Sequence, residues 1–283
     1  MKTKRWVIAA PDRARVEALS REGGYAPLTA AVLAARGTDT PQAAAASLNC
    51  DRSGLHDPFL LTDMDKAAAA IRGAVERGEH IVVYGDYDVD GVTATCIMVD
   101  YLRSKGAVCE YYIPNRLREG YGLSRAAMGQ LYEQGTRLLV TVDSGITADE
   151  EIAAARELGM QVVITDHHEC HDTLPEAEAV VDCKRPDCTY PFDSLAGVGV
   201  AFKLICALEG DTDAVLDRYA DLIALGTVAD VMPIVGENRI IVAEGLKKMA
   251  ETSNVGLEML LREAGMKHKR LTSSTISFVL APR

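Results

Sequence analysis

The sequence of 283 residues contains no apolar run close to the ~20 residues that a membrane-spanning helix needs. The basic start, from Met1 to Trp6, is not followed by the apolar core of a signal peptide. Basic residues are also in the minority, because 30 Lys and Arg face 41 Asp and Glu, for a formal net charge of −11. A uniformly basic surface for nucleic acid is therefore excluded, and a polyanion must be met by a local patch or by bound cations. We expect a soluble, cytoplasmic protein with no membrane partner.

The sequence also lacks the regular cysteine spacing of a disulfide-bonded domain. The seven cysteines are odd in number and form no regular pattern, which favours a reducing compartment. The tightest group, Cys170, Cys183 and Cys188 with His171 nearby, matches no standard zinc spacing, so we favour free thiols over a zinc site. What the chain does have is an ordinary globular balance, with 48% hydrophobic and 25% charged residues.

The order of apolar runs along the chain predicts the fold class. Residues 1–62 predict a helical N-terminal segment of short helices broken by turns. Short apolar runs then alternate with stretches of helical period, which is typical of βαβ units. We expect an α/β fold, a parallel β-sheet flanked by helices, in a domain over 63–283, with the sheet within 63–195 and a mainly helical part over 196–283. Expected strands lie at 80–84, 108–113, 137–142, 161–165 and 179–182, and expected helices at 63–77, 92–103, 124–133, 148–158, 216–226, 237–250 and 255–264.

Acidic residues and histidines follow three of the expected strands, where ligands bind in open parallel sheets. They are listed here in chain order: Asp86, Asp88 and Asp90 after the first strand, Asp143 after the third, and Asp166, His167 and His168 after the fourth. Asp230 comes later, after a helical run. So many anions repel one another in one pocket unless cations compensate them. Carboxylate oxygens suit Mg²⁺ and Mn²⁺, imidazole favours Mn²⁺, and there are enough ligands for two ions.

Each cluster has a simpler interpretation. The three Asp residues after the first strand could form a solvated turn with a helix N-cap. They also imitate the start of an EF-hand loop, but its twelfth position is Ile97 instead of the required Glu. The histidines at positions 56, 80 and 268 are expected to be ordinary surface or structural residues. Convergence after successive strands favours the metal site.

The motifs around these residues point to a known family. Asp86 to Gly91, Val142 to Gly145 and Asp166 to His168 resemble those of the DHH phosphoesterase superfamily. Further stretches, Ile113 to Gly122, Leu195 to Leu204 and Gly226 to Pro233, resemble the bacterial RecJ group of exonucleases specific for single-stranded DNA.

The resemblance implies a nuclease with two Mn²⁺ or Mg²⁺ ions that degrades single-stranded DNA from 5′ to 3′ in DNA repair and recombination. It implies that Asp143 bridges the ions and that His168 faces the scissile phosphate, so these two are the expected catalytic residues. The expected metal ligands are Asp86, Asp88, Asp90, Asp143, His167 and Asp230. Some relatives carry His where this sequence has Tyr84, which we therefore do not count as a ligand.

The substrate side of the expected site is less sharply defined. Within the family motif, Arg116, Arg118, Glu119 and Tyr121 are expected to bind the strand, and the backbone at Ser144 and Gly145 to supply N–H groups. Lys184 and Arg185 are further candidates for phosphate contacts, although they could equally belong to a solvated face. Aromatic residues are only 5% of the chain, so base stacking must rest on few side chains. Expected partners are single-stranded DNA and a single-strand-binding protein or helicase.

Members of this group typically continue into a second C-terminal domain and an OB-fold. We expect both to be absent here, and therefore a truncated chain that binds metal but has weak processivity. Three alternatives remain open. The chain could cleave short oligonucleotides or cyclic dinucleotides, it could be an inactive DHH-derived scaffold subunit, or it could be a phosphatase that uses Asp86 or Asp88 as nucleophile.

Overall fold

The computed structural model describes residue 7 and residues 10–283. It separates into two compact units, one ending at Gly54 and the other spanning Leu55–Arg283. In the first unit, side chains of Asp12 and Thr40 cap the first and third helices by accepting hydrogen bonds from backbone N–H groups. The helices of this unit are α1 (Arg13–Arg21), α2 (Pro27–Ala35), α3 (Pro41–Asn49) and the short 3₁₀ helix η1 (Arg52–Gly54).

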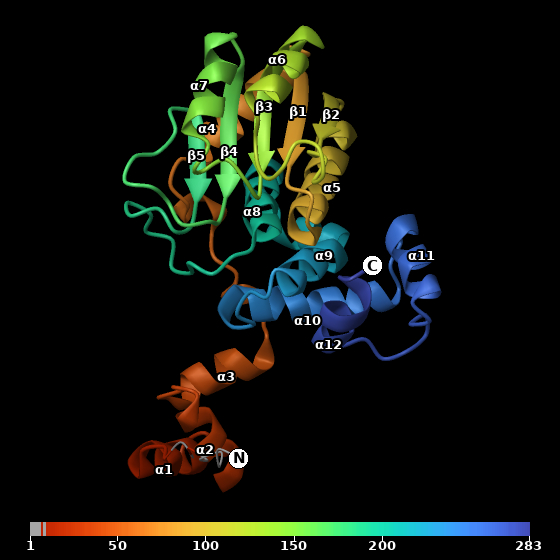
Figure 1. Ribbon diagram of the computed structural model, residues 1–283. Coiled ribbons are helices and arrows are strands. Elements are labelled where there is room, and N and C mark those ends of the chain that lie inside the picture. Colours follow the sequence, from red (N-terminus) through yellow and green to blue (C-terminus); the bar gives the residue numbers. More distant parts are fainter. Residues whose placement is uncertain (1–6, 8–9) are drawn as a thin grey trace, which may run out of the picture. The chain divides into compact units, whose positions relative to one another are not determined.

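The second unit is built on a five-stranded parallel sheet, which confirms the predicted fold class (Figure 1). The strands lie in the order β2-β1-β3-β4-β5, so the chain moves to one side of β1 and then to the other. This reversal places a topological switch point between β1 and β3, where open α/β sheets bind ligands. The strands are β1 (His80–Gly85), β2 (Val108–Tyr112), β3 (Thr136–Val142), β4 (Gln161–Asp166) and β5 (Ala179–Asp182).

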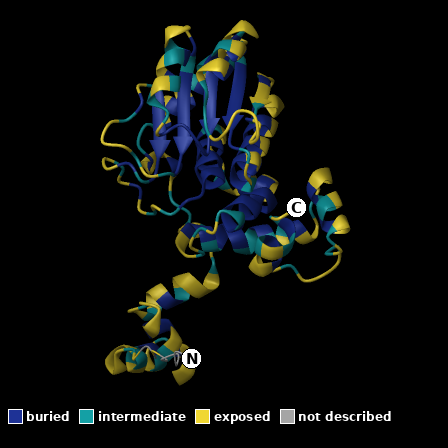
Figure 2. Ribbon diagram, in the orientation of Figure 1, coloured by how far each residue is buried: buried dark blue, intermediate teal, exposed yellow. Residues whose placement is uncertain are grey.

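Helices cover both faces of the sheet, and each face has its own core. On one face, α4 (Met64–Glu76), α5 (Val89–Ser104) and α8 (Gly197–Glu209) pack against the strands. On the other face lie α6 (Arg125–Glu133) and α7 (Asp149–Glu157). The central strands are buried on both sides (Figure 2), which explains why they read as continuous apolar runs in the sequence.

The C-terminal part is helical, as predicted. The long helix α9 (Thr212–Ala229) packs against α5, α8 and α10. The remaining elements are η2 (Pro58–Leu60), α10 (Gly236–Ala250), α11 (Val255–Glu263), the short α12 (Ser273–Thr275) and a π-helical turn, η3 (Ile276–Leu280). In the part of the chain that the structure describes, no helix combines the length and apolarity needed to cross a membrane.

A buried ion pair fixes the start of α10. Lys203 Nζ lies 2.5 Å from Glu237 Oε1, and both side chains are fully buried. Lys203 also donates to the carbonyl of His56, and Tyr190 donates its hydroxyl to Glu237 Oε2. Because every charged atom here is paired, the network joins α8, α10 and the segment before η2. It thereby anchors the loop that connects Asp230 to α10.

Candidate metal centre

The loop after β1 brings three carboxylates to the edge of the sheet. Asp88 is the N-cap of α5, because its side chain accepts a hydrogen bond from Gly91 N at 2.9 Å. The N-cap alternative is therefore confirmed for Asp88, but it does not exclude metal binding by the same carboxylate. Asp90 lies in the first turn of α5 and is buried, and its two oxygens accept hydrogen bonds from Gly197 N and Val198 N at the start of α8.

Asp143 directly follows β3 and lies in the left-handed region, with φ 57°, a conformation that Asp tolerates better than most residues. Its side chain lies directly against the backbone of α8. A Cβ atom added at Gly197 would lie 2.5 Å from Asp143 Oδ1, so only glycine fits there. The close approach of α8 is therefore part of how the Asp143 carboxylate is placed.

The loop after β4 is organised by Asp166. Its Oδ1 accepts hydrogen bonds from His167 N at 2.7 Å and from His168 N at 3.2 Å, and its Oδ2 accepts from Ile146 N. The same Oδ1 pairs with His168 Nδ1 at 2.7 Å. This contact raises the pKa of His168 to about 9, so its ring is positively charged near neutral pH. Burial works against the ionised form of Asp166, but the hydrogen bonds outweigh it and the pKa of Asp166 is lowered.

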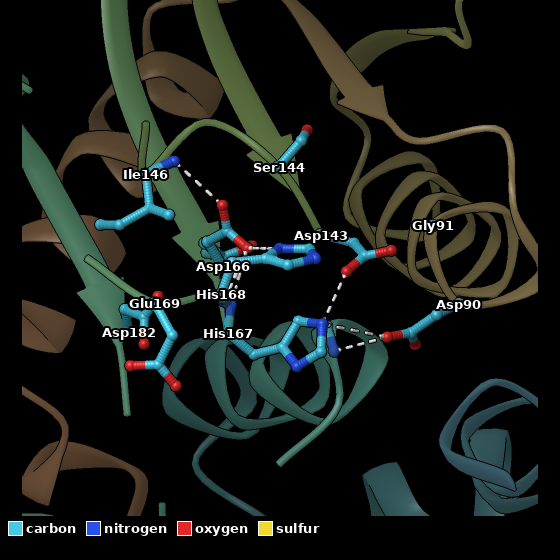
Figure 3. Close-up of polar contacts among 12 residues, drawn as sticks. Asp90, Gly91, Asp143, Ser144, Ile146, Asp166, His167, His168, Glu169 and Asp182 are labelled. Atoms are coloured by element: carbon cyan, nitrogen blue, oxygen red, sulfur yellow. Dashed lines mark hydrogen bonds and ion pairs between the residues drawn. The ribbon is translucent and has the colours of Figure 1, made fainter. Parts of the chain in front are cut away.

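His167 is the centre of the cluster (Figure 3). Its Nε2 lies 3.1 Å from Asp143 Oδ1, 3.8 Å from Asp90 Oδ2 and 3.6 Å from Asp230 Oδ2. Ligand atoms of Asp90, His167 and Asp230 lie within 4.8 Å of one another, and so do those of Asp86, Asp88 and Asp143. A third such group joins Asp143, His167 and His168. Asp143 thus stands between two sets of ligands that come from different elements.

The electrostatics of the cluster indicate that a positive charge is required. Burial, followed by the charges of Asp88 and Asp166, raises the pKa of Asp143 to about 9. Burial also raises the pKa values of Asp86, Asp90 and Asp230, and the nearby Asp143 carboxylate adds to the effect at Asp90. The buried atoms Asp86 Oδ1, Asp143 Oδ1 and His167 Nε2 form no hydrogen bond, although the last two lie 3.1 Å from each other. Buried carboxylate oxygens and an imidazole nitrogen without hydrogen bonds are the donor set of a divalent cation, so the residues fit a pair of such ions.

The expected substrate residues lie on the loop between β2 and α6 and beside β3. The guanidinium of Arg116 lies over the ring of Tyr87 at 5.3 Å, and Tyr121 is 59% exposed with its hydroxyl 3.5 Å from His168 Nε2. Glu119 is engaged within the loop, because its carboxylate accepts hydrogen bonds from Tyr112 Oη and Asn115 N. Arg118 is exposed.

A cavity of about 380 Å³ opens beside His168. Its lining includes His168, Tyr121, Ser144, Gly145 and Asp166, so residues from three different loops meet around one space. Ser144 itself is buried, and its hydroxyl lies 3.4 Å from the carbonyl of Val142. The cavity therefore offers backbone and aromatic groups next to the metal cluster.

Other candidates from the sequence are placed elsewhere. Arg185 is buried between Asp63 and Asp187, with ion pairs of 2.7 Å to each, so it holds the chain together and is not free to meet phosphate. Lys184 pairs with Glu169 at 3.2 Å. Within the described residues, no cysteine belongs to a group of side chains close enough to hold an ion. Tyr84 is fully buried and donates its hydroxyl to the carbonyl of Gly122, so it does not reach the cluster as a ligand.

Sequence reasoning missed three residues in or beside the centre. Asp166 lies in the recognised motif but was not assigned a role, although its strand-end position was a signal. Gly197 begins α8 after a long loop, and its contact with Asp143 arises only from tertiary packing, which the sequence pattern does not indicate. Asp182 ends β5 as a buried carboxylate with one unpartnered oxygen, and burial raises its pKa to about 7.

A parallel sheet with acidic and imidazole side chains at its carboxyl edge is the architecture expected of a metal-dependent phosphoesterase. Comparison with known protein families supports this class. The model of the DHH family, N-terminal domain, matches residues 80–227, more than half of the chain. The chain therefore belongs to the DHH family.

The chain is similar to one kind of member in particular. It is 43% identical over 279 residues to the single-stranded-DNA-specific exonuclease RecJ of Bacillus subtilis, covering 99% of this chain and 35% of the relative. The crystal structure of RecJ from Thermus thermophilus in complex with Mn²⁺ matches with a TM-score of 0.80 at 31% identity, over 97% of this chain and 39% of that one. Its complex with Mg²⁺ matches with a TM-score of 0.68 at 28% identity, over 97% and 36%. The chain thus spans about a third of the length of these relatives.

Proposed function

We propose that this chain is a metal-dependent exonuclease that hydrolyses phosphodiester bonds of single-stranded DNA. The observation that carries the proposal is the position of His167 Nε2, within 3.8 Å of carboxylate oxygens of Asp90, Asp143 and Asp230. Residues from β3, β4, α5 and the end of α9 thereby converge on one point. The similarity to RecJ supports single-stranded DNA as the substrate.

The proposed cofactors are two Mn²⁺ or Mg²⁺ ions. Asp90, His167 and Asp230 would hold one ion, Asp86 and Asp88 the other, and Asp143 would bridge them. Carboxylates suit both metals, and the imidazole favours Mn²⁺. When bound, such a pair activates water and stabilises the attacking and leaving oxygens of a phosphoryl displacement. The binding of Mn²⁺ and Mg²⁺ to the Thermus RecJ structures supports this assignment.

The chain's own residues contribute charge and position. His168 is held by Asp166 and carries a proton near neutral pH, so its Nε2–H can donate to a non-bridging oxygen of the scissile phosphate. Asp166 acts through His168 and is a positioning residue. Asp143 places its buried carboxylate between the two ligand sets, which makes it and His168 the proposed catalytic residues.

The strand is proposed to approach over the loop between β2 and α6. Arg116 and Arg118 would meet backbone phosphates, and Tyr121 would stack with a base. Glu119 would shape this surface through its hydrogen bonds to Tyr112 and Asn115. Ser144 and Gly145 would offer backbone N–H groups in the cavity beside His168.

The finer features rest on the resemblance to the RecJ group. We propose degradation from 5′ to 3′, a role in DNA repair and recombination in the cytoplasm, and a single-strand-binding protein or helicase as partner. We also propose that residues 63–283 form the catalytic DHH domain and that 1–62 is a helical N-terminal segment. An inactive scaffold is disfavoured because every expected ligand of this chain lies in one of the close groups.

An end-labelled nuclease assay tests the proposal. Strands blocked at the 5′ or the 3′ end are incubated with Mn²⁺, with Mg²⁺ or with chelator. The proposal expects metal-dependent release of mononucleotides from single strands with a free 5′ end, and little cleavage of a duplex. Preferred turnover of a dinucleotide would favour the oligonucleotide alternative, and failure to bind Mn²⁺ in calorimetry would favour the scaffold.

A further inference from the structure

The end of α9, next to the metal cluster, has an unusual backbone. Met232 N donates to Thr227 O and Val231 N donates to Val228 O, both at 3.3 Å. These two bonds form a Schellman motif, whose turning residue adopts the left-handed conformation and is most often glycine. Here the turning residue is Val231, with φ 59°.

Valine is a poor residue for this position. The other described non-glycine residues with positive φ are Cys50, Asp63, Asp143 and His268, so Val231 is the one β-branched residue among them. A β-branched side chain in the left-handed region is a true outlier, because its Cβ and branch methyls crowd the backbone. Packing does not offset the cost, since Val231 is 86% exposed. Because the backbone strain at Val231 is not offset by burial of its side chain, we infer that the side chain is kept there for a function.

The position of Val231 suggests what that constraint is. It directly follows Asp230, whose Oδ2 lies 3.6 Å from His167 Nε2. An exposed isopropyl group is therefore anchored one residue from a proposed metal ligand, on a turn whose hydrogen bonds restrict its direction. An apolar group cannot bind phosphate, but it packs well against the face of a nucleobase.

We propose that Val231 is a substrate contact, which packs against the base of the nucleotide next to the scissile phosphate. This inference rests on the proposed function of the same centre. The strained turn keeps the side chain presented to the strand, where a glycine would relieve the backbone but lose the contact. The contact is apolar and reads no base edge, so it favours no particular sequence.

The experiment compares V231G and V231N, both of which suit the left-handed turn, with H268G. His268 is also exposed with positive φ, at 65°, and lies outside the centre, so H268G is the matched control for backbone relief. All three variants are expected to raise the Tm of the metal-free protein. V231G and V231N are expected to raise KM for a single strand about tenfold, because the apolar contact that the bound base would bury is lost, with kcat nearly unchanged. H268G is expected to leave KM unchanged.

A strand with an abasic terminal nucleotide completes the test. On this strand, wild type and V231G should have the same KM, because the base that Val231 contacts is missing. Strand affinity is measured separately by fluorescence anisotropy with Ca²⁺ in place of Mn²⁺, where V231G should bind more weakly. Absence of hydrolysis in the wild type would contradict the proposed function. Wild-type hydrolysis with unchanged KM and affinity in both Val231 variants would overturn the role of Val231 alone.

Discussion

The Cα of Gly197 faces the carboxylate of Asp143 so closely that a methyl group there would sit 2.5 Å from Oδ1. One residue of α8 therefore sets the position of the carboxylate that stands between the two ligand sets. The contact joins a helix of the apolar core to the edge of the sheet.

Substituting Gly197 by alanine should move Asp143 and weaken metal binding. We expect G197A to lower the affinity for Mn²⁺ about tenfold or more, as loss of a supporting contact around metal ligands typically does. Isothermal titration calorimetry measures the change. Gly129 in α6 has no atom near its added Cβ, so G129A is the control, with unchanged affinity and slightly higher stability. Equal Mn²⁺ affinity in G197A and wild type would show that Asp143 tolerates displacement.

Removing ligands should abolish activity without unfolding the protein. Asp143→Ala and His167→Ala are each expected to eliminate Mn²⁺-dependent hydrolysis and the rise in Tm that Mn²⁺ causes in the wild type. The metal-free Tm of Asp143→Ala should equal or exceed that of the wild type, because a carboxyl group whose ionisation is disfavoured by burial and by neighbouring carboxylates is removed. Glu133→Gln on the exposed surface of α6 serves as control. Substantial turnover in either ligand variant would contradict its assigned role.

The metal-free protein should lose stability as pH rises. The pKa of Asp143 is about 9 in the folded state against 3.8 for an ordinary Asp, so the folded state binds more protons between these values. Its contribution to stability is fully present below about pH 4 and is lost as pH rises towards 9. In chelator, the Tm of D143N relative to the wild type should therefore increase from pH 5 to pH 8. A difference that stays constant over this range would argue against a protonated Asp143.

The buried network around Glu237 should make a large contribution to stability. E237Q and K203M each leave a buried charge without its partner, and we expect each to lower the free energy of unfolding by about 3–5 kcal/mol. The double variant K203M/E237Q should lose less than the sum of the single variants, because no net charge remains buried. Urea unfolding of the four proteins gives the coupling energy. Single variants that differ from wild type by less than about 1 kcal/mol would indicate that water reaches the pair.

Much of the sheet could be predicted because its signals are local. Strands β1, β3 and β4 are buried on both faces and therefore appear as apolar runs that end in acidic residues. The strand expected over 80–84 corresponds to β1 (His80–Gly85), and the helix expected over 63–77 corresponds to α4 (Met64–Glu76). The carboxyl ends of the strands then predicted where Asp86, Asp143 and His167 would meet.

Other features could not be predicted because they depend on tertiary contacts. Helix α8 is buried along nearly its whole length, so it lacks the polar face that gives a helix its period, and only a mainly helical region was expected there. Arg185 looked like a surface charge until its partners Asp63 and Asp187 were known. The convergence of Asp230 on His167 depends on how α9 crosses α5, which no spacing in the sequence encodes.

The two hydrogen bonds from the start of α8 to Asp90 have a consequence for how the centre can be observed. The Asp90 carboxylate accepts hydrogen bonds from Gly197 N and Val198 N, and it also faces His167. A cation bound there would therefore compete with the start of α8 for the same two oxygens. Occupancy of the centre is thereby coupled to the solvent exchange of two backbone amides. Deuterium uptake at these positions would report ion loading in the absence of any nucleic acid or any turnover.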